Sequence, residues 1–221
     1  MKKTFCIMLL SLVVAVTFTG CAVKISPGLN SSLGMEAFNN MKTIELHDVS
    51  VSLYIDPKLK DLVINQKIEM GEFSFDIGNA FSVKFIKALT YYFRTINIVG
   101  TPNYTGTPTD AIIRVTLQDV DINTEVKTGF STVSTGTYTR LSIRGEIYDI
   151  DELEIVWEGT TRAVTGKHKE MMQMSYQEAG RGIASAVDWA IDKAVGDLIN
   201  QMTKSSNLRN YIEKWERNHR G

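Results

Sequence analysis

Two stretches of alternating apolar residues, separated by a short acidic turn, constrain the fold of this chain more than any other feature. Apolar or small side chains occupy every second position in residues 141–147 and again in residues 155–163. A period of two is typical of strands that bury one face. The four residues from Asp149 to Glu152 are enough for a tight reversal between them. The pattern therefore predicts an antiparallel hairpin.

Two other segments have the periodicity of helices. Residues 79–93 place aromatic and aliphatic side chains three and four positions apart, with Asn79 as the predicted N-cap. Residues 176–202 carry one long apolar stripe, and Asp188 and Asp192 are predicted to lie outside it. Further apolar alternation predicts strands in residues 49–55, 62–68, 96–99 and 111–117.

These elements together predict the class of fold. Two main helices that pack on one face of a mostly antiparallel sheet would bury the apolar surfaces of both. We therefore predict an α+β domain in residues 43–204. The Thr- and Ser-rich residues 128–139 are either a loop or the polar end of a strand. Residues 22–42 carry turn formers and little periodicity, so residues 21–42 are predicted to be a flexible tether.

The last residues, 205–221, form a short amphipathic tail. Basic side chains alternate there with an apolar set. A basic amphipathic helix of this kind can dock on a partner, or it can fold back on its own domain. The possible partner-binding residues are Leu208, Tyr211, Ile212 and Trp215.

The first residues have the layout of a secretory signal peptide. Lys2 and Lys3 precede an apolar run that ends near Gly20. That run has about 14 residues, whereas a helix needs about 20 to span a bilayer. We therefore predict that residues 1–20 are a cleaved signal peptide.

The end of this segment, Phe18-Thr19-Gly20-Cys21, resembles the lipobox of bacterial lipoproteins, although Phe18 stands where Leu is usual. The resemblance implies that Cys21 becomes the first residue and carries diacylglycerol on its sulfur and an acyl chain such as palmitate on its amino group. Two or three chains anchor a protein stably, because each buried methylene contributes about 0.8 kcal/mol. Ala22 stands where inner-membrane lipoproteins carry Asp. The resemblance therefore implies that the protein is anchored to the outer membrane and lies on its periplasmic face.

The layout of the mature chain is similar to that of YajG-type small envelope lipoproteins. The similarity rests on the lipobox, the helix from Phe81 to Phe93, the hairpin strand that includes Trp157, and the Ala-rich helix that begins near Gly182. It implies a non-enzymatic envelope protein that binds a partner or helps an assembly. Ring-forming lipoproteins share this organisation, so the question whether the chain forms a homo-oligomer stays open.

Composition and motifs exclude several functions. Residues 21–221 contain 22 basic and 25 acidic side chains, whereas nucleic-acid binding needs a basic face. Cys21 is the only cysteine left after cleavage, and lipid on its sulfur leaves no thiol nucleophile. The histidines are His47, His168 and His219, and their spacing matches no zinc motif. We therefore expect no metal and no cofactor.

The acidic hairpin turn lacks the length and the central glycine of an EF-hand, so we interpret it as solvated. The sequence also has no Gly-x-Ser-x-Gly elbow. We therefore predict a lipid-anchored, non-catalytic accessory or assembly component of an outer-membrane or envelope transport system, with an envelope protein as partner. The alternative is a periplasmic ligand carrier or enzyme whose pocket combines the region of Tyr91 and Tyr92 with residues 128–139.

Overall fold

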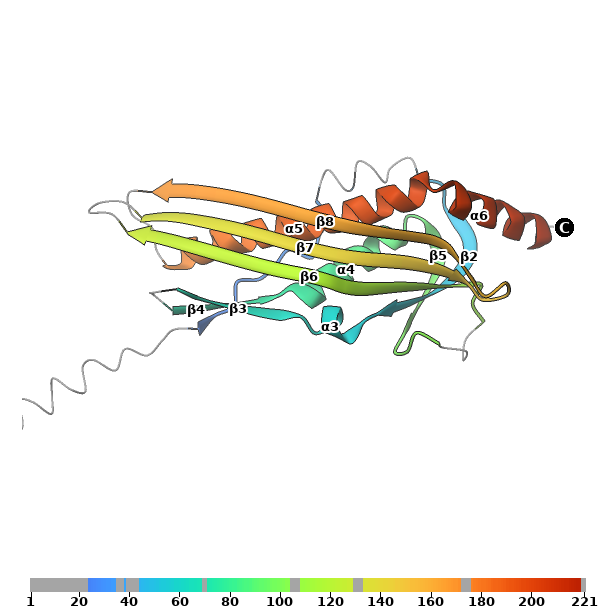
Figure 1. Cartoon of the computed structure of the whole chain (residues 1–221), viewed down its shortest axis with the longest axis horizontal. Coiled ribbons are helices and arrows are strands. Elements are labelled where there is room, and N and C mark those ends of the chain that lie inside the picture. The colour runs from blue at the N-terminus through green and yellow to red at the C-terminus, as the bar shows by residue number, and fades with distance from the viewer. Residues whose placement is uncertain are drawn as a thin grey trace, which may run out of the picture.

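The structure is a computed structural model that describes residues 24–34, 38, 44–68, 71–103, 108–128, 133–171 and 176–219. Its strands are β1 (Lys24–Ile25), β2 (His47–Ile55), β3 (Val63–Ile68), β4 (Gly71–Asp76), β5 (Phe93–Val99), β6 (Ala111–Thr128), β7 (Val133–Asp149) and β8 (Glu154–Met171). They form a five-stranded sheet in the order β5-β2-β6-β7-β8 and a three-stranded sheet in the order β1-β4-β3. Figure 1 shows β6, β7 and β8 running along the length of the molecule.

The predicted hairpin is confirmed as β7 and β8. Ile147 pairs with Trp157 and Leu141 with Ala163, in the antiparallel register that the apolar alternation requires. In the turn, Asp149 Oδ1 accepts a hydrogen bond of 2.9 Å from the backbone N–H of Asp151. Residues 133–139 belong to β7, so the strand alternative holds for that part of the Thr-rich segment.

Two glycines that face each other make room for the largest side chain of the hairpin. Gly145 of β7 pairs with Gly159 of β8, and the Trp157 ring lies over both. A Cβ added at Gly159 would lie 2.6 Å from Trp157 Cζ2, and one added at Gly145 would lie 3.0 Å from Cζ3. Glycine at these positions therefore lets the indole pack flat on the inner face of the sheet.

Strand β2 has a role that the sequence did not predict. It pairs in parallel with both β5 and β6, so Leu53 lies between Ile98 and Ile113. Parallel neighbours need a crossover connection, and the chain between β2 and β5 supplies one. It contains the short helix α3 (Pro57–Lys60), strands β3 and β4, and a longer helix.

That longer helix is α4 (Ile77–Leu89), and its boundaries differ from the prediction. Asp76 is the N-cap, since its side chain accepts a 3.1 Å hydrogen bond from the N–H of Asn79. The prediction of Asn79 as the cap was therefore wrong. At the other end the helix stops at Leu89, and Phe93 begins β5 instead.

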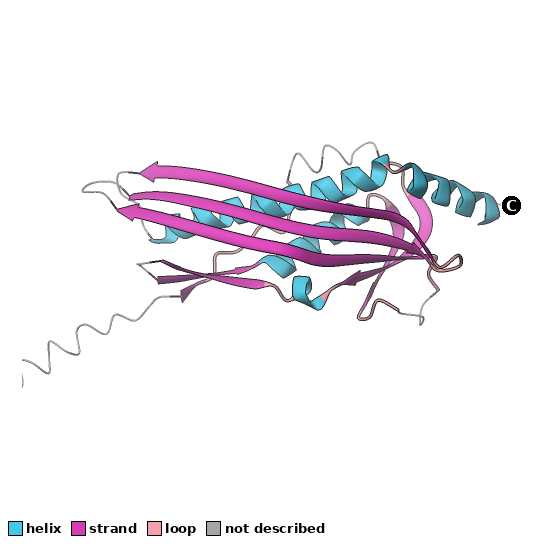
Figure 2. Ribbon diagram, in the orientation of Figure 1, coloured by secondary structure: helices cyan, strands magenta, loops and turns pink. Residues whose placement is uncertain are grey.

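The second main helix, α5 (Tyr176–Lys204), matches its prediction closely. It packs on β7, β8 and α4, and both long helices lie behind the five-stranded sheet (Figure 2). One hydrophobic core joins residues from the sheet and from both helices. The predicted α+β class, with a largely antiparallel sheet and two helices on one face, is confirmed. A last helix, α6 (Ser206–His219), follows α5 almost directly.

No helix among the described residues combines the length and the apolar character that crossing a membrane requires.

Candidate functional site

The N-terminal strap, residues 24–34, lies across the domain and forms one wall of the candidate site. At its start β1 pairs in parallel with β4, and Lys24 Nζ lies 3.4 Å from Glu72 Oε1. At its end the backbone N–H of Gly34 donates a 3.1 Å hydrogen bond to Asp192 Oδ1 of α5. These residues were predicted to belong to a flexible tether, and the structure corrects that prediction for the strap.

The strap stays on the domain because every fourth residue is apolar. Ile25, Leu29 and Leu33 are half-buried and pack against the hydrophobic core. Lys87 of α4 adds a hydrogen bond of 3.2 Å from its Nζ to the carbonyl of Ser31. The segment was predicted to be a tether because it is rich in turn formers. Its three apolar residues, spread over nine positions, give too little periodicity to predict that the segment packs on the domain.

Beside the end of the strap, a buried lysine joins the two long helices. Lys84 of α4 is fully buried, and its Nζ donates to Asp188 Oδ1 at 2.6 Å and to Asp192 Oδ1 at 2.8 Å. Two carboxylates from α5 therefore surround one ammonium group. A buried charge is tolerated when it is paired and hydrogen-bonded in this way. Asp192 also accepts from Gly34, so this cluster links α4, α5 and the strap.

This cluster was not predicted from the sequence, although the sequence contains a signal for it. Lys84 lies three residues after Phe81 and one before Phe85, on the apolar face of α4. A lysine on such a face needs a buried acidic partner. Asp188 and Asp192, predicted to lie outside the apolar stripe of α5, are those partners.

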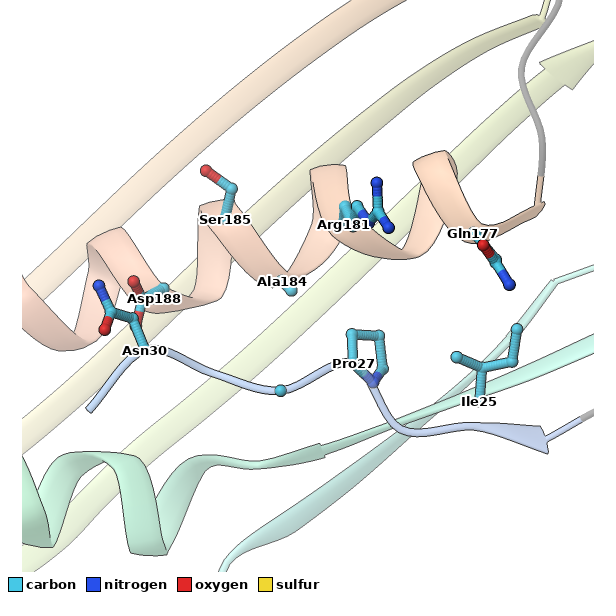
Figure 3. Close-up of a pocket in the computed structure, with 9 residues that line it drawn as sticks. Ile25, Pro27, Asn30, Gln177, Arg181, Ala184, Ser185 and Asp188 are labelled. Carbon is cyan, nitrogen blue, oxygen red and sulfur yellow. The ribbon is translucent and has the colours of Figure 1, made fainter. Parts of the chain in front are cut away.

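The strap cavity lies between the middle of the strap and α5 (Figure 3). Its volume is about 510 Å³, within the range of sites for small ligands. Figure 3 shows Asn30 close to Asp188 at one end of the cavity and Ile25 facing Gln177 at the other. The other lining residues are Pro27, Gly28, Arg181, Ala184 and Ser185. The strap is therefore held at both ends, while its middle leaves space above α5.

The four predicted partner-binding residues of the C-terminal tail face the domain. Leu208 and Ile212 are fully buried, and Tyr211 and Trp215 are half-buried against the core. The Tyr211 hydroxyl donates a 3.1 Å hydrogen bond to the carbonyl of Asp110, and burial raises the pKa of Tyr211 above its ordinary range. Helix α6 thus folds back on the domain, and a partner role for these residues stays a prediction.

A second hollow, the α6 cavity, lies where α6 covers β2 and the residue before β5. Its volume is about 320 Å³, and Tyr92, His47 and Glu216 are among its lining residues. His47 Nδ1 lies 3.4 Å from Glu216 Oε1, and the rings of His47 and Tyr92 meet edge to face. Burial raises the pKa of Tyr92 to about 12, and the positive charge of Arg209 partly offsets that rise.

The described parts of the two segments in the alternative hypothesis do not line a common pocket. Tyr92 lines the α6 cavity, whereas Tyr91 is exposed. Thr137 and Tyr138 line a shallow hollow near the start of β7. The start of β7 and the region of β5 lie at opposite ends of the molecule in Figure 1. These residues therefore belong to two separate surfaces and not to the single pocket of the hypothesis.

The other predicted residues take varied positions. His219 stacks on Trp215, and the side chain of His168 lies outside the described part of the structure. The described ranges contain no group of three His, Cys, Asp or Glu side chains that could hold a metal ion. The signal peptide and the lipidation site Cys21 also lie outside the described residues.

Comparisons with known proteins found similar structures only. No family model and no curated protein matches the chain. A protein from Xanthomonas campestris is 8% identical, with 82% of this chain and 98% of that chain aligned at a TM-score of 0.46. A structure described as a homologue of the neuraminyllactose-binding hemagglutinin of Helicobacter pylori is 11% identical. The alignment covers 87% of this chain and 100% of that chain, at a TM-score of 0.44. A minor lipoprotein from Acinetobacter baumannii is 13% identical, and the alignment covers 73% of this chain and 94% of that chain at a TM-score of 0.33.

Proposed function

We propose that this chain is a lipid-anchored, non-catalytic envelope protein. In this proposal Cys21 carries the lipid, the domain lies on the periplasmic face of the outer membrane, and it serves as an accessory or assembly component of an envelope transport system. The observation that carries the proposal is the lipobox Phe18-Thr19-Gly20-Cys21, together with the strand β1 that begins three residues later.

The position of β1 indicates how a lipid-anchored domain would be oriented relative to the membrane. Three residues span at most about 10 Å, so lipid on Cys21 would hold Lys24 close to the membrane surface. Strand β1, the blue arrow in Figure 1, lies toward the end of the molecule where β6 ends, and the C-terminus lies at the opposite end. The membrane would therefore face the β6 end, and helix α6 would point into the periplasm, where a partner protein could reach it.

Metabolic labelling with a palmitate analogue tests the anchor. We expect label on the wild-type protein and none on Cys21→Ala, which would also leave the outer-membrane fraction. The chain offers a matched control, because its other cysteine, Cys6, lies within the predicted signal peptide. Cys6→Ala should label as the wild type does. Label that persists in Cys21→Ala, or an unlabelled wild type, would contradict the proposal.

Photo-crosslinking tests the orientation and the partner. A crosslinking amino acid at Lys67, exposed near the end of β3, should label lipid or outer-membrane material. The same amino acid at Arg217, exposed on α6, should label a periplasmic protein reproducibly. Lipid adducts from Arg217 and none from Lys67 would contradict the orientation. The absence of any protein adduct from Arg217 or other exposed α6 positions would contradict the role in assembly.

A further inference from the structure

The strap cavity has one charged side chain toward each of its ends. Asp188 of α5 lies at the end that includes Asn30, and Arg181 of the same helix lies toward the end that includes Gln177 (Figure 3). Residues seven positions apart on a helix share a face and are separated by about 10 Å along its axis. The wall formed by α5 therefore presents an acidic and a basic group at a fixed spacing.

The acidic end carries a net negative charge. Asp188 and Asp192 both bond to Lys84, so two carboxylates share one ammonium group. About one fifth of the Asp188 side chain is exposed, at 19%, and this side chain lines the cavity. The cluster therefore leaves one negative charge that is not neutralised beside the cavity. An ammonium group of a ligand would neutralise it through a charge-assisted hydrogen bond.

The basic end suits a carboxylate. Arg181 is exposed, lines the cavity and forms no ion pair with another described residue. A guanidinium group presents its N–H donors in a planar fork that matches the two oxygens of a carboxylate. Gln177, one turn earlier on α5, lines the same end and has a side-chain amide that can donate to the same carboxylate.

The opposite wall, formed by the strap, offers backbone groups to a ligand. The strap belongs to no strand after Ile25, and the N–H groups of Gly28 and Leu29 make no backbone hydrogen bond to another described residue. Gly28 lines the cavity, and a Cβ added there would meet no atom within 4 Å. The strap backbone is therefore accessible at this point. Exposed backbone of this kind binds extended peptides by hydrogen bonds between main chains.

A single small ion does not satisfy both ends of the cavity. An inorganic anion at Arg181 would leave the charge beside Asp188 unpaired, and a small cation at Asp188 would leave Arg181 unpaired. A zwitterion with its charges about 10 Å apart pairs with both groups. An extended tripeptide has this separation between its ammonium and carboxylate groups, because each residue spans about 3.3–3.6 Å.

We propose that the strap cavity binds a short extended peptide of about three residues with free termini. Its ammonium group bonds to Asp188, its carboxylate bonds to Arg181 and Gln177, and its backbone lies along the strap at Gly28. The cavity volume of about 510 Å³ leaves room for the peptide side chains. The bound peptide joins the strap to α5, and opening of the strap admits and releases it. The site does not depend on the lipid anchor.

Calorimetric titration of the full chain in detergent with trialanine tests the site, at constant ionic strength. We expect saturable binding with a Kd of about 1 mM or less, which weakens at least about tenfold in Arg181→Gln. The matched control is Arg162→Gln, which removes an exposed guanidinium group from β8 and should bind as the wild type does. The absence of binding at about 10 mM trialanine, or equal binding in the two variants, would overturn the proposal.

Altered peptides test each end without a change in the protein, since a variant of Asp188 would also break the buried cluster with Lys84. N-acetyl-trialanine lacks the ammonium group and trialanine amide lacks the carboxylate, so each should bind at least about tenfold more weakly than trialanine. Dialanine should also bind more weakly, because its charges are only about 7 Å apart. A blocked peptide that binds as tightly as trialanine would refute the zwitterionic ligand.

Hydrogen exchange locates the bound peptide. Saturating trialanine should slow exchange at the amides of the strap and leave exchange in α6 unchanged, because the peptide joins the strap to α5. Strap amides that exchange at the same rate with and without saturating trialanine would show that the peptide binds elsewhere, and the strap cavity would lose its assignment.

Discussion

The two ends of the described chain are both attached to the domain, but by different means. The strap is held by half-buried aliphatic residues, a two-stranded pairing and a few polar contacts at its ends, with a cavity of about 510 Å³ under its middle. Helix α6 is held by two fully buried aliphatic residues, Leu208 and Ile212, and by a hydrogen bond from Tyr211. An exposed ion pair between Lys214 and Glu152 adds a further contact.

This difference indicates how easily each end can detach. Detachment of α6 exposes fully buried apolar side chains, whereas detachment of the strap exposes side chains that are already partly in water. Local opening follows the buried apolar area that is lost. We therefore expect the strap to open more often than α6, although the sequence predicted a flexible tether in place of the strap and left open whether the tail docks on a partner or folds back on the domain.

The largest expected effect concerns the cluster that links the strap to the long helices. Lys84→Met leaves Asp188 and Asp192 close together without their shared cation. Removal of one partner from a buried ion pair typically costs about 3–5 kcal/mol, so we expect a loss of that size in the free energy of unfolding. Chemical denaturation measures it. The triple variant with Asp188→Asn and Asp192→Asn removes the charges together and should recover most of the loss. No recovery would show that the packing of Lys84, and not its charge, matters.

The next effect compares the apolar contacts of the two ends directly. Ile212→Ala should lower the free energy of unfolding by about 2–4 kcal/mol, because it leaves a cavity in the core. Ile25→Ala in the strap should lower it by about 1 kcal/mol or less, because Ile25 is only half-buried. Urea denaturation of both variants checks the comparison. Equal losses would refute the difference between the two ends.

Alkaline pH should weaken the contacts that Tyr92 makes at the α6 end. The pKa of Tyr92 is about 12 in the folded protein against 10.0 for the free side chain, so the folded state keeps its proton longer than the unfolded state. The contribution of Tyr92 is complete below pH 10 and is lost as the pH rises from about 10 to about 12, at a cost on the order of 1–2 kcal/mol. Tyr211 has a raised pKa and acts in the same direction. Unfolding of wild type and Tyr92→Phe between pH 9 and pH 11.5 tests this, since the variant should lose less stability.

The sequence predicted the parts of the fold that depend on local periodicity. The β7–β8 hairpin and the helix α5 follow directly from apolar alternation and from one apolar stripe. The parallel pairing of β2 with β5 and β6 was not predictable in this way, because it depends on a crossover through four other elements. Periodicity shows which face of a strand is buried, and it does not show which strands become neighbours.

The candidate sites show the same limit. Lys84 on an apolar helix face indicates a buried acidic partner, but nothing local shows that the partners lie more than a hundred residues later on α5. The α6 cavity depends on the contact between α6 and β2, two elements at opposite ends of the domain sequence. Residues that line a site from distant elements are found only when the packing of those elements is known.

The smallest expected effect would sharpen the comparison at the start of the strap. Lys24→Ala removes an exposed ion pair with Glu72, and such pairs contribute about 0–1 kcal/mol. The free energy of global unfolding should therefore stay almost unchanged. Hydrogen exchange should nevertheless become faster at the amides of residues 24–33 and stay the same in α6, because the strap opens without the rest of the domain. Equal acceleration in both regions would show that the strap and α6 open together.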